Sequence, residues 1–390
     1  MTTIASTSTT ILDLPPSCIE VCPWDQSVIA VGTYHLEKKD DAEPCAGHNP
    51  SIQKRRGSIL IFQFSDDCRT VELAQTWPTD YAILDLHFPI RGTEKSKNFW
   101  TANSTGSLSC YSVSENPSFI ITGSSICQQW APNVLVLAFA FHPTISQVLG
   151  ATLSDGSVVL CKISESDKVG VQSMKHVGSH DLEAWTLSFD LFGNRCLSGG
   201  DDAVLQSICV QNLQEITRCD SIEEDFHPVI EWRNRRIHSA GVTAILPLQE
   251  NLVLTGSYDD TLRVVILTKP PRLLAEKTMG GGVWRLKLIR VDQAANHWVY
   301  DILASCMHAG ARIVRITLAK DTKMDLQIDI LAQFEEHESM NYGSDFIRRG
   351  DEYAILSTSF YDRRLCVWSF HTLEFDTSQN NDIKESNSVT

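Results

Sequence analysis

One segment, residues 253–265, reads Val253-Leu-Thr-Gly-Ser-Tyr-Asp-Asp-Thr-Leu-Arg-Val-Val265. A short apolar run leads into small residues and an acidic turn, and alternating apolar residues follow the turn. β-Branched residues favour strands, and an Asp in a turn can accept hydrogen bonds from the backbone that follows it. The segment therefore predicts a β-hairpin whose turn contains Asp259.

The same pattern recurs along the chain. Successive turns from position 155 to position 362 are 47, 57, 49 and 54 residues apart. A repeat of about 40–50 residues with several short strands is typical of a β-propeller blade. Seven copies predict an all-β fold, a single seven-bladed β-propeller over residues 1–370. The other copies have turns at Asp155, Asp202, His308 and Asp362, with weaker copies at residues 28–32, resuming at 57–62, and at 100–110.

The two ends of the propeller are predicted to meet. The last copy ends at Phe370 without a following outer strand, whereas an isolated apolar stretch at residues 11–14 precedes the first copy. We expect residues near 8–14 to supply the missing outer strand, because closing the ring removes open sheet edges. Residues 371–390 are polar and are predicted to form a disordered tail. Two insertions, at residues 35–56 and 220–237, are predicted to be surface loops.

Composition limits the partners. A net charge of -15 argues against binding to nucleic-acid backbones and suits a cationic partner. The 12 cysteines contain no Cys-x-x-Cys pair, which indicates reduced thiols and neither a disulfide framework nor a zinc site. No signal peptide or membrane-spanning run is present in the sequence. We expect a cytoplasmic monomer with no cofactor, metal, nucleic acid or membrane partner.

Three histidines precede predicted inner strands. In WD-repeat propellers, a histidine at this place hydrogen-bonds a Ser or Thr of the next strand and the turn Asp, which satisfies buried polar groups. A structural role is therefore one interpretation of all three, and a catalytic His180–Asp202 pair is the alternative for the first. The expected groups are His180 with Ser198 and Asp202, His238 with Thr255 and Asp259, and His337 with Ser357, Asp362 and Trp368.

The sixth copy departs from this pattern. It has Gly280-Gly-Gly-Val-Trp-Arg285 where a histidine would stand, and His308 replaces the turn Asp. Local departures of this kind are expected at functional sites, although a tolerated substitution in a degenerate repeat is the alternative. Histidine can act as a general acid or base near neutral pH, and glycines can present backbone N–H groups to an oxyanion. No serine-hydrolase elbow, zinc-protease motif or nucleotide-binding loop is present, so these residues alone indicate a binding scaffold.

Several motifs follow one another in order between residues 179 and 368. They are Ser179-His-Asp-Leu-Glu-Ala-Trp185, Ser198-Gly-Gly-Asp-Asp202, Gly256-Ser-Tyr-Asp259, Gly280-Gly-Gly-Val-Trp-Arg285, Cys306-Met-His-Ala-Gly310, Tyr342-Gly343 and Ser359-Phe-Tyr-Asp362. Together they resemble the WD-repeat diphthine methylesterases of diphthamide biosynthesis. The resemblance implies hydrolysis of the methyl ester of methylated diphthine, a modified histidine of translation elongation factor two that carries a quaternary ammonium. The acid that is released is then amidated by another enzyme.

The resemblance and the residue chemistry suggest roles for particular side chains. We expect His308 to be the base that activates water, with Gly281, Gly282 and Arg285 as donors to the oxyanion. Aromatic faces attract a quaternary ammonium by about 0.5–2 kcal/mol per good contact. The other expected substrate-binding residues are Trp185, Glu183, Trp284, Tyr342 and His337.

Alternatives remain open at this stage. The aromatic residues could pack between blades, and His180 with Asp202 could be the catalytic pair while His308 orients the substrate. A non-catalytic scaffold, an adaptor that reads a modified residue, and a metal-dependent esterase using His180, His308 and His337 are the competing functions.

Overall fold

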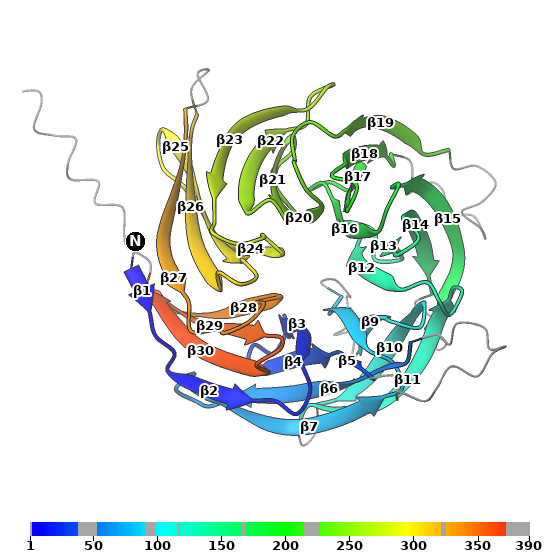
Figure 1. The fold of residues 1–390 in the computed structure, drawn as a ribbon, viewed down its shortest axis with the longest axis vertical. Helices are drawn as coiled ribbons and strands as arrows, with labels where there is room; N and C mark the ends of the chain where they lie inside the picture. The colour runs from blue at the N-terminus through cyan, green and yellow to red at the C-terminus, as the bar shows by residue number, and fades with distance from the viewer. Residues whose placement is uncertain are drawn as a thin grey trace, which may run out of the picture.

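The computed structural model describes residues 2–37, 53–89, 98–115, 118–164, 169–211, 213, 227–320 and 325–371. Every element whose bounds it gives is a β-strand, and the strands form seven sheets arranged as blades around one axis (Figure 1). Within each blade, consecutive strands are antiparallel neighbours. The predicted all-β, seven-bladed propeller is confirmed.

In the first four blades, the strands follow one another from the inside of the ring outward. Blade one contains β3 (Pro16–Val21), β4 (Val28–Thr33), β6 (Arg55–Phe64) and β7 (Val71–Thr79), with β5 (His35–Leu36) beside β6. Blade two contains β8 (Ile83–His87), β9 (Asn98–Asn103), β10 (Ser107–Ser114) and β11 (Ile120–Gln129). Blade three contains β12 (Val136–Phe141), β13 (Val148–Leu153), β14 (Ser157–Ile163) and β15 (Val171–Ser179). Blade four contains β16 (Ala184–Phe189), β17 (Arg195–Gly200), β18 (Leu205–Cys209) and β19 (Val229–Asn234).

The last three blades complete the ring. Blade five contains β20 (Val242–Gln249), β21 (Leu252–Ser257), β22 (Thr261–Ile266) and β23 (Arg272–Thr278). Blade six contains β24 (Arg285–Gln293), β25 (His297–Ser305), β26 (Ala311–Ala319) and β27 (Leu326–Phe334), with β1 (Thr2–Ile4) outside β27. Blade seven contains β28 (Gly343–Arg349), β29 (Glu352–Ser359), β30 (Arg364–His371) and β2 (Ser8–Ile11).

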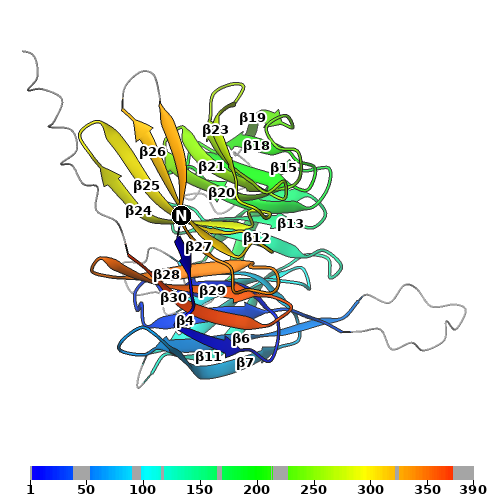
Figure 2. The same cartoon turned by 60° about the vertical axis from the view of Figure 1, so that its left-hand side comes forward.

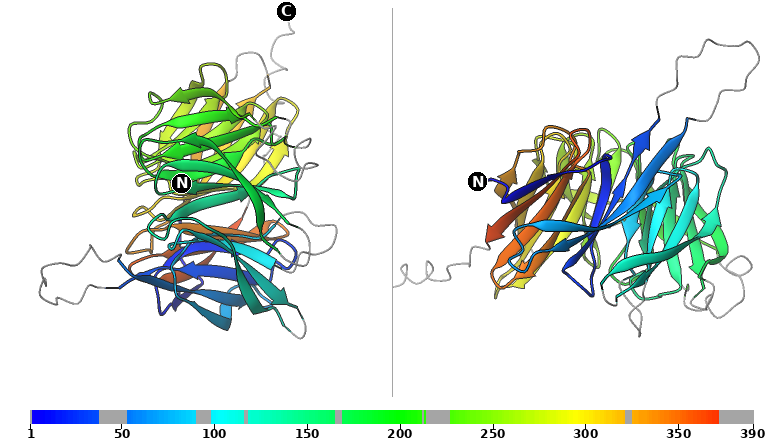
Figure 3. Two further views of the ribbon diagram at one scale, coloured as in Figure 1. Left: turned by 90° about the vertical axis from the view of Figure 1, so that its right-hand side faces the viewer. Right: turned by 90° about the horizontal axis from the view of Figure 1, so that it is seen from below.

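The N-terminal segment closes the ring, as predicted. Strand β2 runs antiparallel to β30, from the pair Ser8–Val367 to the pair Ile11–Arg364. Leu12 is buried directly after this strand and belongs to the core cluster that blades one and seven share. Strand β1 was not expected: it pairs in parallel with β27 and gives blade six a fifth strand. The N-terminus therefore lies on the outer wall of the ring, as Figures 2 and 3 show from other sides.

Both predicted surface loops contain strand residues. The insertion at residues 220–237 includes β19, the outer strand of blade four, so the surface-loop prediction is wrong for residues 229–234. The reason is that its polar residues find partners: Glu231 accepts hydrogen bonds from Arg195 (3.1 Å) and from Ser207 (2.9 Å). The first insertion, residues 35–56, contains β5 and the first two residues of β6, so the surface-loop prediction is also wrong at these ends, which pair with each other. His371, the first residue of the predicted tail, ends β30. Residues 38–52, 220–226 and the tail from residue 372 lie outside the described residues.

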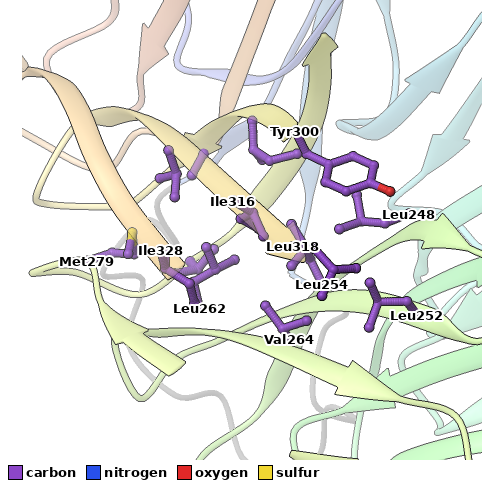
Figure 4. Close-up of a cluster of buried hydrophobic side chains, with 14 of the residues drawn as sticks. Leu248, Leu252, Leu254, Leu262, Val264, Met279, Tyr300, Ile316, Leu318 and Ile328 are labelled. Carbon is purple, nitrogen blue, oxygen red and sulfur yellow. The ribbon is translucent and has the colours of Figure 1, made fainter. Parts of the chain in front are cut away.

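The hydrophobic core lies within and between the blades. Figure 4 shows the cluster where blade five meets blade six, in which Leu254 and Val264 of blade five pack near Ile316 of blade six. All three side chains are buried, and complete burial of such a side chain contributes about 1.5–3 kcal/mol. The cysteines of the described segments are free thiols. Among the described residues, no helix is long and apolar enough to span a membrane.

Candidate binding site at one end of the propeller axis

Glycines set the position of Trp284. The segment before β24 packs against the turn between β25 and β26, where a Cβ on Gly281 would overlap the carbonyl oxygen of Cys306. A Cβ on Gly282 would lie 2.6 Å from the sulfur of Met307. Position 281 therefore requires glycine, because the clash there is with backbone, whereas the Met307 side chain beside Gly282 can move. The backbone N–H of Trp284 then donates to the carbonyl of Ser305 at 2.8 Å, which places the indole at the start of the inner strand.

Five aromatic side chains from four blades meet at this end of the ring, and we call them the aromatic arc. The ring centroids of Trp284 are 5.5 Å from Trp185, 5.7 Å from Tyr258 and 5.0 Å from Tyr342. Tyr342 continues the series to Phe360 at 5.4 Å. All five side chains are half-buried, so each keeps part of its surface exposed. The structure therefore brings together Trp185, Trp284 and Tyr342, as the sequence suggested.

Two members of the arc were missed by sequence reasoning. Tyr258 and Phe360 follow the second strands of blades five and seven, just before the turns that hold Asp259 and Asp362. The signal was present, because these positions correspond in the repeat and both carry aromatic residues. Tyr34, which follows the second strand of blade one, lies 6.0 Å from Phe360 and extends the series toward that blade.

Acidic groups lie beside the arc. The indole N–H of Trp185 donates to the carboxylate of Asp201 at 3.0 Å, and the backbone N–H of Asp201 donates to the carbonyl of Glu183 at 2.8 Å. Burial raises the pKa of Tyr258, and the neighbouring Tyr342, Asp201 and Glu183 raise it further, against a smaller opposing effect of Arg285. Tyr258 is therefore a neutral phenol at neutral pH, with the negative charges of Asp201 and Glu183 and the positive charge of Arg285 near it.

Arg285 lies beneath the arc. Its guanidinium carbon is 5.2 Å from the ring centroid of Trp284, and its Nη1 donates to the carbonyls of Trp284 (3.2 Å) and Thr243 (3.4 Å). Its Nη2 is 3.8 Å from a carboxylate oxygen of Asp85, which is an ion-pair distance but too long for a hydrogen bond. Within the described segments, Nε and Nη2 of Arg285 make no hydrogen bond.

A buried group of charges crosses the axis, and we call Glu20, Asp85, His87, Lys287 and Asp345 the axial charge cluster. His87 lies 2.6 Å from Glu20 and 3.2 Å from Asp85, and Lys287 lies 2.5 Å from Asp345 and 3.9 Å from Glu20. Burial lowers the pKa of His87, but Asp85 and Glu20 outweigh it and raise that pKa to about 10. His87 is therefore protonated at neutral pH, and the cluster joins blades one, two, six and seven.

Sequence reasoning missed this cluster. Its members occupy inner strands β3, β8, β24 and β28, where polar residues interrupt otherwise apolar stretches. Side chains of a strand alternate between its two faces, so Asp85 and His87 share one face of β8, and Arg285 and Lys287 share one face of β24. An alignment of the seven inner strands would have shown these charges at neighbouring levels of the ring.

His180 and Asp202 form a closed structural group. The Nδ1 of His180 is 3.0 Å from Asp202, and its Nε2 is 2.9 Å from the hydroxyl of Ser198 and 3.2 Å from the amide of Gln206. Burial opposes ionisation of Asp202, but hydrogen bonds from His180 and the backbone of Asp181 lower its pKa to about 2. Both ring nitrogens of His180 thus have protein partners, and the imidazole is buried. This geometry favours the structural interpretation over the catalytic pair.

The hydrogen bonds of His337 and His238 match the expected groups only in part. His337 lies 2.8 Å from Ser357, to which Trp368 also donates at 3.0 Å. Asp362 instead accepts the backbone N–H of Glu338 at 3.0 Å. His337 is buried within this group and does not contact the arc in the described structure.

His238 lies 2.8 Å from Thr255, as expected. The turn residue Asp259 is engaged elsewhere, because it accepts hydrogen bonds from Arg263 at 2.8 Å and from the backbone of Ser239 at 2.9 Å.

His308 is exposed in the turn between β25 and β26. In the described part of the chain, its imidazole makes no hydrogen bond, ion pair or ring contact. The turn itself is held beside blade seven, because the backbone N–H of Asn341 donates to the carbonyl of Met307 at 3.0 Å. The described residues also contain no group of three His, Cys, Asp or Glu side chains placed to hold a metal ion, so the metal alternative with His180, His308 and His337 gains no support.

Solved structures share the fold of this chain. A chain of the mitotic checkpoint complex superposes with a TM-score of 0.60 at 12% identity, covering 95% of this chain and 94% of the other. The WD40 β-propeller domain of Doa1 superposes with a TM-score of 0.58 at 14% identity, covering 94% of this chain and 97% of the domain. These likenesses agree with the β-propeller fold of this chain. No family model matches it.

Curated relatives of this propeller share one name. The diphthine methyltransferase of Schizosaccharomyces pombe is 29% identical, over 90% of this chain and 94% of its own length. The diphthine methyltransferase of Saccharomyces cerevisiae is 26% identical, over 91% of this chain and 95% of its own length. The mouse diphthine methyltransferase is 29% identical, over 86% of this chain and 68% of its own length.

These names correct one expectation. A diphthine methyltransferase adds a methyl group to diphthine, which is the opposite of removing a methyl ester. The methylesterase function that the sequence motifs suggested is therefore contradicted, and the scaffold alternative is not better supported. The roles of His308 as the base and of Gly281 and Gly282 as oxyanion donors depended on hydrolysis. The packing of the two glycines accounts for their presence without it.

Proposed function

We propose that this propeller is an enzyme of diphthamide biosynthesis that binds the diphthine side chain of a protein substrate at the aromatic arc and methylates it. The meeting of Trp185, Tyr258, Trp284, Tyr342 and Phe360 at one end of the axis is the observation that carries the proposal. The relatives' name supplies the reaction, and the motif resemblance supplies elongation factor two as the substrate protein.

The arc suits a quaternary ammonium. Such a group keeps its charge at every pH but has no N–H with which to donate a hydrogen bond, so aromatic faces are its natural binding surface. Each good contact contributes about 0.5–2 kcal/mol. Asp201 and Glu183 add negative charge beside Trp185. On the scale of the whole chain, the net charge of -15 would speed encounter with a basic domain.

The proposed reaction needs no general base. The nitrogen of diphthine is already quaternary, so its carboxylate is the group left to accept a methyl. A carboxylate oxygen then forms a bond to the methyl carbon while the donor's bond to that carbon breaks, and no proton is released. The chain's own residues would bind and orient the acceptor, which is consistent with an exposed His308 that has no partner in the described structure.

The glycine segment before β24 does not have the geometry of a site for the methyl donor. In doubly wound α/β folds, adenosine-containing cofactors lie at a glycine-rich turn that leads from a strand into a helix. The Gly280–Gly282 segment leads into strand β24, and Cys306 already fills the space above Gly281. These residues do not fit such a donor. The aromatic arc accounts for the acceptor alone.

The test uses elongation factor two that carries diphthine. The factor is mixed with the propeller and S-adenosylmethionine, and its intact mass is followed. We expect a gain of one methyl group, and we expect Trp284→Leu to lower the rate by about 10-fold or more, since it removes the central ring of the arc. Trp298→Leu is the matched control, because this half-buried indole lies in the same blade outside the arc. No mass change, or a loss of mass, would overturn the proposal.

A further inference from the structure

Arg285 is the cation beside the arc that keeps hydrogen-bond donors available. Lys287 lies 2.5 Å from Asp345, and His87 lies 2.6 Å from Glu20, so these two cations have carboxylates at hydrogen-bond distance. The closest carboxylate to Arg285 is Asp85 at 3.8 Å, beyond that distance. A guanidinium has five donors, and the described structure shows hydrogen bonds from Nη1 alone.

Asp85 attracts Arg285 electrostatically but does not accept a hydrogen bond from its guanidinium. The Oδ2 atom of Asp85 lies 3.2 Å from Nε2 of His87 and accepts a hydrogen bond from the backbone N–H of Phe139 at 3.3 Å, whereas Oδ1 faces Nη2 of Arg285 at 3.8 Å. Burial opposes ionisation of Asp85, but His87 and Arg285 outweigh it and lower its pKa, so it stays negative. Blades two and six lie on opposite sides of the ring, and the Asp85–Arg285 attraction acts across the axis. Arg285 is therefore fixed below the rings with Nε and Nη2 unused.

A cation-binding surface and an available guanidinium lie side by side. The guanidinium carbon of Arg285 is 5.2 Å from the Trp284 centroid, so one small ligand can touch the exposed part of the aromatic arc and the guanidinium together. A plain quaternary ammonium would be repelled by Arg285. A ligand with a carboxylate next to its ammonium would satisfy both, because guanidinium binds carboxylates through paired hydrogen bonds.

We infer that the site selects zwitterions of the betaine class, with the quaternary ammonium against the aromatic arc and the carboxylate on Arg285. The inference rests on the proposed function for its site, and it adds which chemical group each part of the site takes. Diphthine, with a quaternary ammonium and an acid on one side chain, belongs to this class. Asp85 is a positioning residue and does not touch the ligand.

Three small probes separate the two contacts. Trimethylglycine carries both charges, choline carries the ammonium alone, and 3,3-dimethylbutyrate carries the carboxylate on an uncharged isostere. Binding to the full chain is measured by calorimetry and by the fluorescence of the arc tryptophans. We expect trimethylglycine to bind about 10- to 100-fold more tightly than choline, the range that a charged hydrogen bond supplies, and more tightly than 3,3-dimethylbutyrate.

Variants assign the preference to Arg285. Arg285→Gln should remove the advantage of trimethylglycine over choline, and Arg285→Lys should keep part of it. Arg348→Gln is the matched control, since Arg348 also lies over an aromatic ring, Tyr353, at 5.9 Å but outside the arc. Thermal melting of each variant confirms that it is folded. Equal affinities of the wild-type chain for trimethylglycine and choline, no binding of trimethylglycine, or an unchanged preference in folded Arg285→Gln would overturn the inference.

The two proposals fail separately. If the chain prefers trimethylglycine but adds no methyl group to the elongation factor, the zwitterion site is supported and the methyl-transfer function is refuted. If it adds a methyl group but does not prefer trimethylglycine, the methyl-transfer function is supported and the zwitterion site is refuted.

Discussion

At the residue scale, this propeller shows how the same amino acid takes different roles at equivalent places. His180, His238 and His337 are buried and hydrogen-bonded to a Ser or Thr of the neighbouring strand. His87 is half-buried but lies between two carboxylates and is protonated. Burial lowers the pKa of His238 and His337, whereas the neighbouring carboxylates raise the pKa of His87.

The buried histidines predict loss of stability in acid. Burial lowers the pKa of His337 to about 4, although Asp362 and Glu336 oppose this, and burial lowers the pKa of His238 to about 3. In the unfolded chain, both protonate near pH 6.5. The unfolded state therefore binds more protons between these values, so stability falls as pH falls from about 6.5 to about 4. His337 alone contributes a loss on the order of 3 kcal/mol.

Denaturant unfolding at pH 7 and pH 4.5 checks this. His337→Gln retains a hydrogen-bonding side chain but does not titrate, so it should lose less stability over the same interval than the wild-type chain. An equal loss in both proteins would show that His337 does not carry the effect.

A second residue-scale prediction concerns His308. Because its side chain is exposed and without contacts in the described structure, His308→Ala should change the free energy of unfolding by no more than a surface substitution does, within about 0.5 kcal/mol. The rate of methyl gain should also persist, since the proposed reaction releases no proton. A large loss of turnover in the folded variant would show that a base is needed after all.

At the scale of single elements, the N-terminal strand β2 closes the ring by pairing with β30. Deleting residues 1–11 removes β1 and β2, exposes the edge of β30 and uncovers the core that Leu12 joins. We expect a fall of several degrees in the melting temperature. Deleting residues 1–5 removes only the three-residue β1 and should have a smaller effect. Equal melting temperatures of the three proteins would contradict closure by β2.

The axial charge cluster gives another element-scale prediction. His87→Ala removes the closest cation from Asp85 and Glu20, while Arg285 and Lys287 remain at 3.8 Å and 3.9 Å, so we expect a cost of about 2 kcal/mol, less than for a buried charge left without any partner. Glu37→Gln is the control, because its pair with Lys54 is largely exposed and is worth about 0–1 kcal/mol. Chemical unfolding measures both. A cost for His87→Ala as small as that for Glu37→Gln would mean that the cluster does not hold the inner strands together.

Particular elements also show how far the sequence reaches. The turn repeat predicts all seven blades and the closing strand, because a hairpin leaves a local signature in each copy. It did not predict the three-residue β1, whose partner β27 is distant in sequence, or β19, whose mixed-charge residues suggested a loop. The sequence identified part of the aromatic arc, because Trp185 and Trp284 stand out near the starts of their inner strands. Tyr258 and Phe360 can be recognised only when the turns of different blades are compared with one another. The axial charge cluster joins four blades, and in the sequence its members appear only as polar residues within separate inner strands.

At the scale of the whole molecule, the ring joins a surface for a quaternary ammonium to a charge network that crosses its axis. Arg285 belongs to both, since it lies against Trp284 and faces Asp85 from the opposite blade. Packing between blades fixes these groups before any ligand arrives, which lowers the cost of ordering them on binding. The fold itself does not determine the reaction. The aromatic arc supports diphthine as the methyl acceptor, and the names of the relatives support methyl transfer as the reaction.

The most direct measurement follows a labelled methyl group. Elongation factor two that carries diphthine is incubated with the propeller and S-adenosylmethionine labelled with deuterium in its methyl group, and the modified histidine is then analysed by fragment mass spectrometry. The account predicts one labelled methyl on the carboxylate of that side chain, and a much lower yield with Trp284→Leu than with Trp298→Leu. A side chain that stays unlabelled, or that loses a methyl group already present, would contradict it.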